Sequence, residues 1–295
     1  MRNSVVVILV SAIIVALLAG GCTQSSPAPA SATPTPVPTI VAPADTVKVM
    51  DSSLGKILTD AKGLTLYYFI TDVPASGTST CYTAANCTHF WPIFSVDSFV
   101  VSPPLRAADF SSMARTDGTK QTAYSGWPLY YFVKDAKPGD VLGENVLKTW
   151  YVAKPDYTVM IASKPETGAY LTDPVGKTLY FFNQDTTGTS TCTGACIAKW
   201  PAFSSPAVVA PSVLKPADFS QISRADGIKQ TAFMGKPLYY YSGDAAPGAA
   251  NGQGLNGRWY VANITGALPA PTPTPTTVPT TVPTTIHYSS GGGGY

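Results

Sequence analysis

One short aromatic pattern occurs four times in this chain, and it constrains the fold more than any other feature. Each copy reads Leu-Tyr-aromatic-aromatic-x-x-Asp. Three positions define each copy: the first tyrosine, the aromatic residue two positions later, and the aspartate. In the four copies these residues are Tyr67, Phe69 and Asp72; Tyr130, Phe132 and Asp135; Tyr180, Phe182 and Asp185; and Tyr239, Tyr241 and Asp244. Aromatic residues at this density favour a β-strand, in which side chains alternate between two faces. Tyr67 and Phe69 should therefore share one face, with Asp72 in the turn that follows.

The four copies belong to two larger modules with the same order of motifs. Trp91-Pro92 recurs as Trp200-Pro201, and Trp150-Tyr151-Val152-Ala153 recurs as Trp259-Tyr260-Val261-Ala262. The spacing between the modules changes only across a cysteine-containing segment, and loops tolerate such length changes better than paired strands do. We expect repeat module 1 over residues 47–155 and repeat module 2 over residues 156–265.

The pattern predicts an all-β fold in which both modules are built from β-hairpins. Each module would form a sandwich or barrel, and the alternative is one propeller-like ring of four units. Asp173-Pro174-Val175-Gly176 suits a tight turn between a strand that ends near Thr172 and a strand over 177–183. Helix signals are scarce, and the best candidates are Pro104–Met113 and Lys215–Ile222.

The fourfold Tyr-x-(Phe/Trp/Tyr)-x-x-Asp motif, together with the repeated Trp-Pro and Trp-Tyr-Val-Ala elements, resembles the secreted-repeat lipoprotein family named for that motif. The resemblance covers roughly residues 54–263. It implies an exported, repeat-built protein of uncharacterised function, and it provides no catalytic residues to transfer.

The N-terminus reads as an export signal. A positive charge at Arg2 and an apolar run over 5–18 predict a signal peptide over 1–21, because the run is shorter than the roughly 20 residues of a membrane-spanning helix. The small residues before Cys22 predict lipidation of that cysteine, although Ala19 stands where the usual processing box has leucine. The Pro/Ser/Thr-rich segment 22–46 reads as an extended linker from a lipid anchor on the outer face of the cell membrane.

The C-terminal segment 266–295 is rich in Pro, Thr and Gly and reads as a disordered tail. Two sequons, at Asn86 and Asn263, are possible glycosylation sites.

The remaining cysteines form one pair in the same loop of each module. Since exported proteins keep disulfides and the duplication gives each module its own pair, we expect Cys81–Cys87 and Cys192–Cys196 disulfides. The competing interpretation is a metal or haem site, because Cys87-Thr88-His89 resembles the end of a haem-attachment motif. Its spacing does not fit that motif, so we expect no metal site and no cofactor.

Catalytic residues are scarce, and we predict none. The repeated aspartates are expected to accept backbone N–H bonds in their turns; paired carboxylates for glycoside cleavage are the alternative. The repeated aromatics are expected in the core, with an exposed stacking face as the alternative. Trp127 is a candidate surface contact, because Lys236 takes its place in module 2.

We therefore predict a cell-surface lipoprotein with a non-enzymatic binding or structural role in the envelope. The alternatives are an envelope redox or metal-binding protein that uses Cys and His, and a carbohydrate-active enzyme that uses the repeated aspartates. Partners would be the membrane, through the lipid anchor, and an envelope glycan or surface protein. The net charge of +2, with 12% charged residues, offers no electrostatic footprint for nucleic acid.

Overall fold

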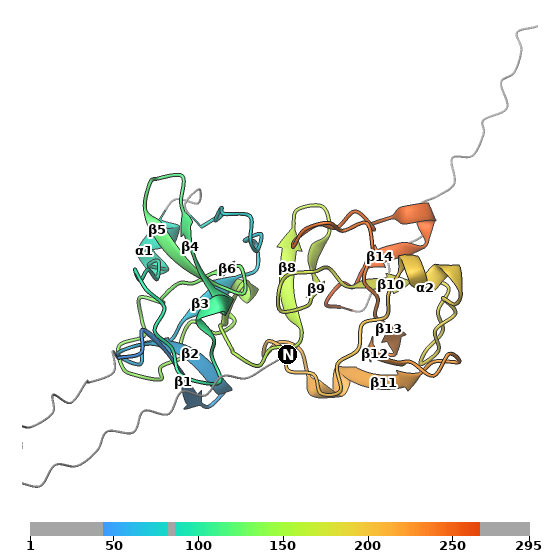
Figure 1. Ribbon diagram of the computed structural model, residues 1–295, viewed down its shortest axis with the longest axis horizontal. Coiled ribbons are helices and arrows are strands. Elements are labelled where there is room, and N and C mark those ends of the chain that lie inside the picture. The colour runs from blue at the N-terminus through green and yellow to red at the C-terminus, as the bar shows by residue number, and fades with distance from the viewer. Residues whose placement is uncertain (1–43, 82–85, 266–295) are drawn as a thin grey trace, which may run out of the picture. The chain divides into compact units, whose positions relative to one another are not determined.

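The computed structural model describes residues 44–81 and 86–265, which form short antiparallel strands joined by turns (Figure 1). The predicted signal peptide, Cys22, nearly all of the linker and the C-terminal tail lie outside the described residues. Within the described ranges, no helix has the length and apolar character needed to cross a membrane. Both repeat modules belong to one compact unit.

Module 1 contains three small antiparallel sheets. One is the hairpin β1–β2, the second is the meander β4–β5–β6, and the third pairs β3 with the distant β7. Its elements are β1 (Val47–Ser52), β2 (Gly55–Asp60), β3 (Tyr67–Phe69), α1 (Cys87–Phe90), η1 (Ala107–Asp109), β4 (Phe110–Ala114), β5 (Lys120–Tyr124), β6 (Trp127–Pro128), η2 (Val146–Lys148) and β7 (Trp150–Val152).

Module 2 repeats this plan element by element. The hairpin β8–β9, the meander β11–β12–β13 and the pair β10–β14 take the same places. Its elements are β8 (Met160–Lys164), β9 (Gly168–Thr172), β10 (Tyr180–Phe182), α2 (Ala195–Lys199), η3 (Pro216–Asp218), β11 (Phe219–Ser223), β12 (Lys229–Phe233), β13 (Lys236–Pro237), η4 (Leu255–Gly257) and β14 (Trp259–Val261).

The predicted all-β, hairpin-built modules are confirmed. The sheets of the described residues hold two or three strands each, none of them closes into a barrel, and none contains strands of both modules. The motif strands bridge within a module, Tyr67 opposite Tyr130 and Tyr180 opposite Tyr239, so the four copies associate two by two instead of forming one ring of four.

The hairpin predicted around the turn at 173–176 is present. The Gly176 N–H donates to the Asp173 carbonyl at 3.0 Å, Gly176 has φ 83°, and Thr172 at the end of β9 bridges Thr178 across the turn. The chain then continues as β10, which pairs with β14. One local prediction needs correction. The helices expected over Pro104–Met113 and Lys215–Ile222 are only three-residue 3₁₀ turns, because the residues after them pair as strands with β5 and β12.

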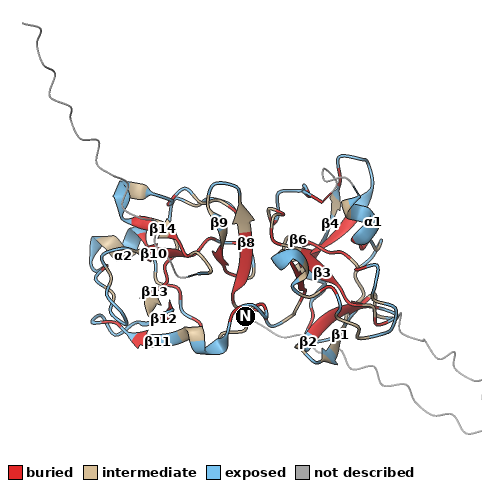
Figure 2. Cartoon of the chain, turned by 180° about the vertical axis from the view of Figure 1, so that it is seen from behind, coloured by how far each residue is buried: buried red, intermediate tan, exposed pale blue. Residues whose placement is uncertain are grey.

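Leu66 and the first two residues of β3 contribute to three different clusters of the core. Tyr67 packs with Trp91, Tyr130 and Trp150 inside module 1. Tyr68, on the opposite face, joins the cluster that continues into module 2, while Leu66 belongs to the cluster around Phe94 and Phe110. Figure 2 shows buried residues along the central strands of both modules and exposed residues in the connecting loops.

Candidate functional site

The motif tyrosines and aspartates hold the two repeats of each module together. In module 1 the Tyr67 hydroxyl donates to Asp135 at 2.6 Å, and the Tyr130 hydroxyl donates to Asp72 at 2.6 Å. Each tyrosine thus binds the aspartate of the other repeat. Module 2 contains the same reciprocal exchange, Tyr180 to Asp244 and Tyr239 to Asp185, again at 2.6 Å.

The second oxygen of each motif aspartate accepts a backbone N–H bond. Asp72 receives the N–H of Thr80, Asp135 that of Leu142, Asp185 that of Thr191 and Asp244 that of Asn251, at 2.7–3.0 Å. The expected turn-capping role therefore describes one oxygen of each carboxylate. The bond to the distant tyrosine is not visible in the local sequence, because it joins residues more than fifty positions apart.

Burial raises the pKa values of the tyrosines and aspartates in this network. Desolvation raises the pKa of Asp72, and hydrogen bonds from Tyr130 and Thr80 offset part of that rise. The pKa of each motif tyrosine is raised above its ordinary value, first by burial and further by the neighbouring carboxylate. These tyrosines remain neutral hydrogen-bond donors over the physiological pH range.

A stack of four aromatic rings lies beside each pair of Tyr–Asp bonds. In module 1 the order is Phe69, Trp150, Trp91, Phe132, with ring centroids 4.2, 3.8 and 4.4 Å apart. Module 2 has the order Phe182, Trp259, Trp200, Tyr241, at 4.3, 3.7 and 4.3 Å. The tryptophans of both stacks are buried, so each stack is an internal column of rings. Its two ends are the aromatic residues that lie two positions after the motif tyrosines.

Each module carries one disulfide, Cys81–Cys87 and Cys192–Cys196, with S–S distances of 2.04 and 2.02 Å. In module 2 the loop is tied down by the buried Arg224, whose guanidinium donates to the Cys192 carbonyl at 2.6 Å. His89 is exposed beside Phe90, and the described residues contain no group of His, Cys, Asp or Glu side chains that could hold a metal ion.

A pocket of about 410 Å³ in module 2 brings one motif aspartate next to a second carboxylate. Asp244 and Asp173 line it, together with Lys177 and Tyr241. All four carboxylate oxygens already accept hydrogen bonds, from Tyr180 and Asn251 on Asp244 and from Tyr240 and the backbone on Asp173. A glycoside-cleaving pair would have to give up these bonds to reach a substrate.

Trp127, the candidate surface contact, is only 1% exposed, which corrects that expectation. Its indole N–H donates to the Pro174 carbonyl at 3.0 Å, and its ring packs edge-on against Tyr68 at 5.1 Å. Trp127 therefore connects module 1 to the turn at 173–176 of module 2. A side chain at Gly176 would overlap Pro74 of module 1, so the same turn also needs glycine for this close approach.

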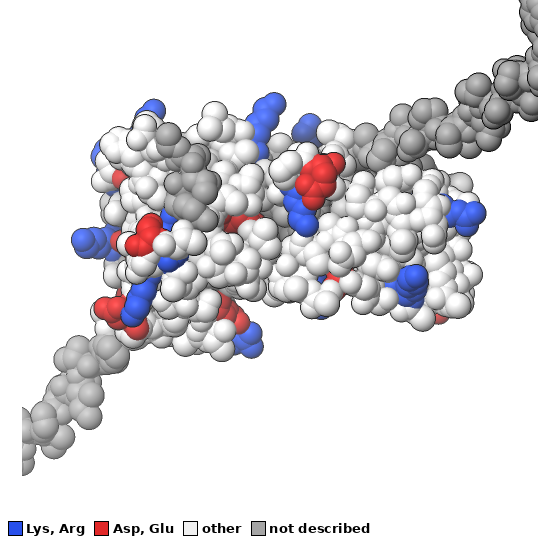
Figure 3. Space-filling model, turned by 90° about the horizontal axis from the view of Figure 1, so that it is seen from above, with Lys and Arg blue, Asp and Glu red and all other residues white. Residues whose placement is uncertain are grey.

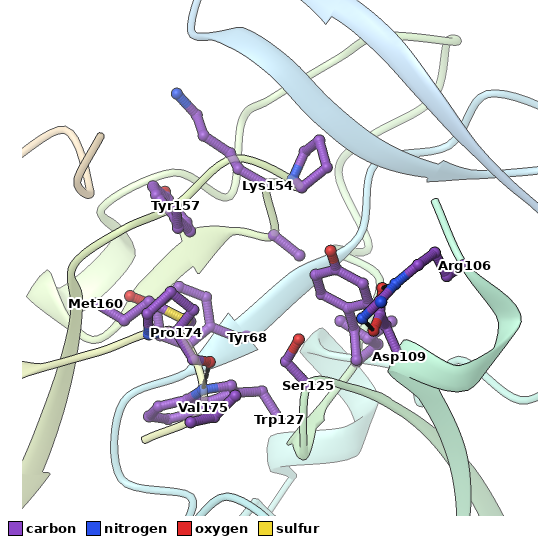
Figure 4. Close-up of a pocket in the computed structure, with 14 residues that line it drawn as sticks. Tyr68, Arg106, Asp109, Ser125, Trp127, Lys154, Tyr157, Met160, Pro174 and Val175 are labelled. Atoms are coloured by element: carbon purple, nitrogen blue, oxygen red, sulfur yellow. Dashed lines mark hydrogen bonds and ion pairs between the residues drawn. The ribbon is translucent and has the colours of Figure 1, made fainter. Parts of the chain in front are cut away.

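Behind Trp127 lies a pocket of about 250 Å³ where the modules meet (Figure 4). Tyr68, Tyr124, Trp127 and Tyr157 form its aromatic walls, and Arg106, Asp109 and Lys154 are its charged residues. Arg106 and Asp109 neutralise each other through two bonds of 2.6 and 3.1 Å. Lys154 Nζ donates to the Leu54 carbonyl and lies 5.6 Å from the Tyr157 ring centroid.

The pocket contains a buried polar group that the protein does not satisfy. Tyr157 is 6% exposed, and its hydroxyl has no hydrogen-bond partner within the described part of the chain. The Tyr68 hydroxyl accepts the Ile161 N–H at 3.4 Å. The hydroxyl is enclosed by protein atoms, and leaving it unsatisfied costs free energy that an acceptor reaching it would recover.

Module 2 has different residues at the positions equivalent to Tyr68, Tyr124 and Trp127. Phe181 and Phe233 replace Tyr68 and Tyr124, and Lys236 replaces Trp127, with its Nζ 5.3 Å from the Phe181 ring centroid. The repeated fold of module 2 therefore forms without hydroxyls at the positions of Tyr68 and Tyr124. The mismatches between the modules at these three positions are the sequence signal for this site, and the sequence-based prediction covers only Trp127.

The comparisons with known proteins agree with the internal repeats. A family model described as a secreted repeat of unknown function matches residues 48–95, 111–154, 162–204 and 220–263, together more than half of the chain. Neither the curated proteins nor the solved structures contain a match to this chain. Each matched segment carries one copy of the Tyr–Asp motif.

Proposed function

Because the chain belongs to a family of secreted repeats of unknown function, we propose that it is a non-enzymatic binding protein of the cell surface. A lipid on Cys22 would hold it at the outer face of the membrane, and the pocket beside Trp127 would bind one ring-sized unit of an envelope glycan. The aromatic walls of this pocket carry the proposal, and its lining includes Tyr157, whose enclosed hydroxyl lacks a hydrogen-bond partner among the described residues.

Two further observations support a binding role. The repeated Tyr, Trp and Asp side chains bind one another, so the chemistry that recurs four times maintains the fold. On the face shown in Figure 3, charged side chains lie singly or next to opposite charges and most of the surface is uncharged, which suits a neutral ligand better than a polyanion. The pocket offers flat apolar walls and hydroxyl donors, the combination that a sugar ring requires.

The pocket is tested by replacing Tyr157 with Phe, which removes one hydroxyl and keeps the ring. Fragments of envelope glycans would be screened against the wild-type protein by saturation-transfer NMR, and affinities measured by calorimetry. We expect Tyr157→Phe to weaken binding roughly five- to tenfold, the value of one hydrogen bond. Tyr131→Phe is the matched control, because Tyr131 bonds Asp60 outside the pocket. Equal affinity of Tyr157→Phe and wild type would refute the pocket assignment.

The anchor is tested separately by growing cells with a labelled fatty acid. We expect the label on the peptide that begins at Cys22 and release of a Cys22→Ala variant from the membrane fraction. If the chain is labelled but binds no glycan, the anchor proposal stands and the pocket proposal is refuted. If the chain is not labelled, only the anchor proposal is refuted.

A further inference from the structure

The loops beside the Trp91–Phe132 end of the module 1 stack expose four large apolar side chains. The exposed fractions are 49% for Phe90, 51% for Val133, 60% for Leu142 and 82% for Leu147. Together these four residues form what we term the apolar tip. Burial of such side chains is the usual source of folding free energy, so their exposure in one region calls for an explanation.

Hydrogen bonds hold the segments of the apolar tip together. The Val133 N–H donates to the Phe90 carbonyl at 3.0 Å, and the Leu142 N–H donates to Asp135, two residues beyond Val133, at 3.0 Å. Leu147 follows within the same loop, where the Val146 N–H donates to the Gly143 carbonyl. The four side chains thus come from one connected group of loops.

Module 2 has the same loops with polar side chains at all four positions. Lys199, Ser242, Asn251 and Asn256 replace Phe90, Val133, Leu142 and Leu147 in order, and all four are exposed. The shared fold therefore does not need apolar residues there.

The backbone conformation at Leu147 also indicates that the fold does not need leucine at this position. Leu147 and Lys148 have φ of 53° and 58°, a region that favours Gly and Asn, and module 2 places Asn256 and Gly257 at these positions. Module 1 therefore keeps a leucine in an unfavourable conformation with its side chain in solvent.

Basic residues flank the apolar tip. Lys134, Lys137 and Lys148 are exposed, and none of them forms an ion pair among the residues that the structure describes. Module 2 has Gly243, Ala246 and Gly257 instead.

The carboxylates of the same loops are engaged elsewhere. Asp135 and Asp140 accept backbone N–H groups of their own loop, and Glu144 accepts the Val152 N–H at 2.7 Å. Exposed apolar side chains with lysines at their edge match the interface of a bilayer that contains anionic lipids.

We propose that the apolar tip of module 1 inserts into the surface of the membrane that carries the lipid anchor. This step rests on the lipid anchor of the proposed function. Module 1 follows the segment that begins at Cys22, which would reach about 70 Å if fully extended, enough for module 1 to return to the bilayer. Tip and anchor together provide the two signals that stable membrane association requires. Module 2, with its polar loops, remains available to partners in the envelope.

The test uses the processed chain, residues 22–295, made without acyl groups, so that its result is independent of lipidation and of any pocket ligand. Flotation with phosphatidylcholine vesicles, with and without phosphatidylglycerol, gives the partition coefficient. We expect binding that is stronger on anionic vesicles and weakens as salt increases. The variant Val133→Ser, Leu142→Asn, Leu147→Asn carries the residues of module 2 at these positions. Its partition coefficient should be at least tenfold lower than that of the wild type.

Two control variants make the outcome decisive. Replacing Lys134, Lys137 and Lys148 with Ala should remove the preference for anionic vesicles, by roughly fivefold for each lysine. Val213→Ser with Ile228→Asn removes exposed apolar side chains of module 2 and should leave partitioning unchanged. Equal partitioning of the tip variant and the wild type, or no vesicle binding by the wild type, would overturn the proposal. So would sedimentation that shows the tip joining two copies of the chain.

Discussion

The two modules share an internal framework and differ in what surrounds it. Both contain the reciprocal Tyr–Asp bonds, the four-ring stack and the loop disulfide, with nearly equal distances. Module 1 has Tyr68, Tyr124 and Trp127 at positions where module 2 has Phe181, Phe233 and Lys236, and among the described residues the apolar tip belongs to module 1. Shared features show what the fold needs, and the mismatches show what one module has gained beyond it.

Alkaline pH should affect the two modules differently, and this is the largest effect we expect. Burial raises the pKa of Tyr68 and Tyr124 in module 1, and module 2 has Phe181 and Phe233 at the equivalent positions. A tyrosine with a raised pKa stabilises the fold below its unfolded value of about 10, and this contribution is lost as pH rises further. Each one removes roughly 1.4 kcal/mol of unfolding free energy per pH unit above that value.

We therefore expect module 1 to open first as the pH passes about 11. Pulse proteolysis with mapping of the fragments by mass spectrometry checks this order. Earlier cleavage in module 2 would contradict the comparison.

Trp127→Ala and Lys236→Ala replace equivalent residues and should give very different losses of stability. Trp127 is buried against Tyr68 and bonded to Pro174, so we expect a loss of about 3–5 kcal/mol. Lys236 is partly exposed, and its truncation should cost less than about 1 kcal/mol. Urea unfolding curves measure both, and similar losses would mean that the junction does not depend on Trp127.

Tyr67→Phe and Tyr180→Phe should have matching effects, because the two bonds are equivalent. Each variant leaves a partly buried carboxylate, Asp135 or Asp244, without its tyrosine donor. We expect a loss of about 2 kcal/mol in both modules by chemical denaturation. A loss in only one of them would show that the frameworks are energetically distinct despite their shared geometry.

Tyr124→Phe should have the smallest effect on stability, within about 0.5 kcal/mol, because module 2 already carries Phe233 at this position. The same variant should weaken glycan binding if the pocket acts as proposed. A large loss of stability would instead assign the Tyr124 hydroxyl to the fold.

Sequence reasoning captured the features that repeat and missed those that join distant residues. The duplication led to the modules and the two disulfides, and strand alternation correctly separated Tyr67 from Tyr68. The partner of each motif aspartate was not predictable, because nothing local to Asp72 indicates Tyr130.

The junction pocket was harder to predict still. Trp127 was correctly marked as different between the modules, but an unmatched tryptophan suits a buried contact between modules as well as an exposed one. Deciding between the two required knowing that the turn at 173–176 packs against it.

The reciprocal bond between Tyr67 and Asp135, and between Tyr130 and Asp72, also limits how such a gene can change in length. One repeat alone would hold a tyrosine and an aspartate that each lack a partner, and half of a ring stack. Loss or gain of a single repeat by recombination would therefore produce a chain that cannot complete its last module. Viable descendants should differ by pairs, with an even number of motif copies.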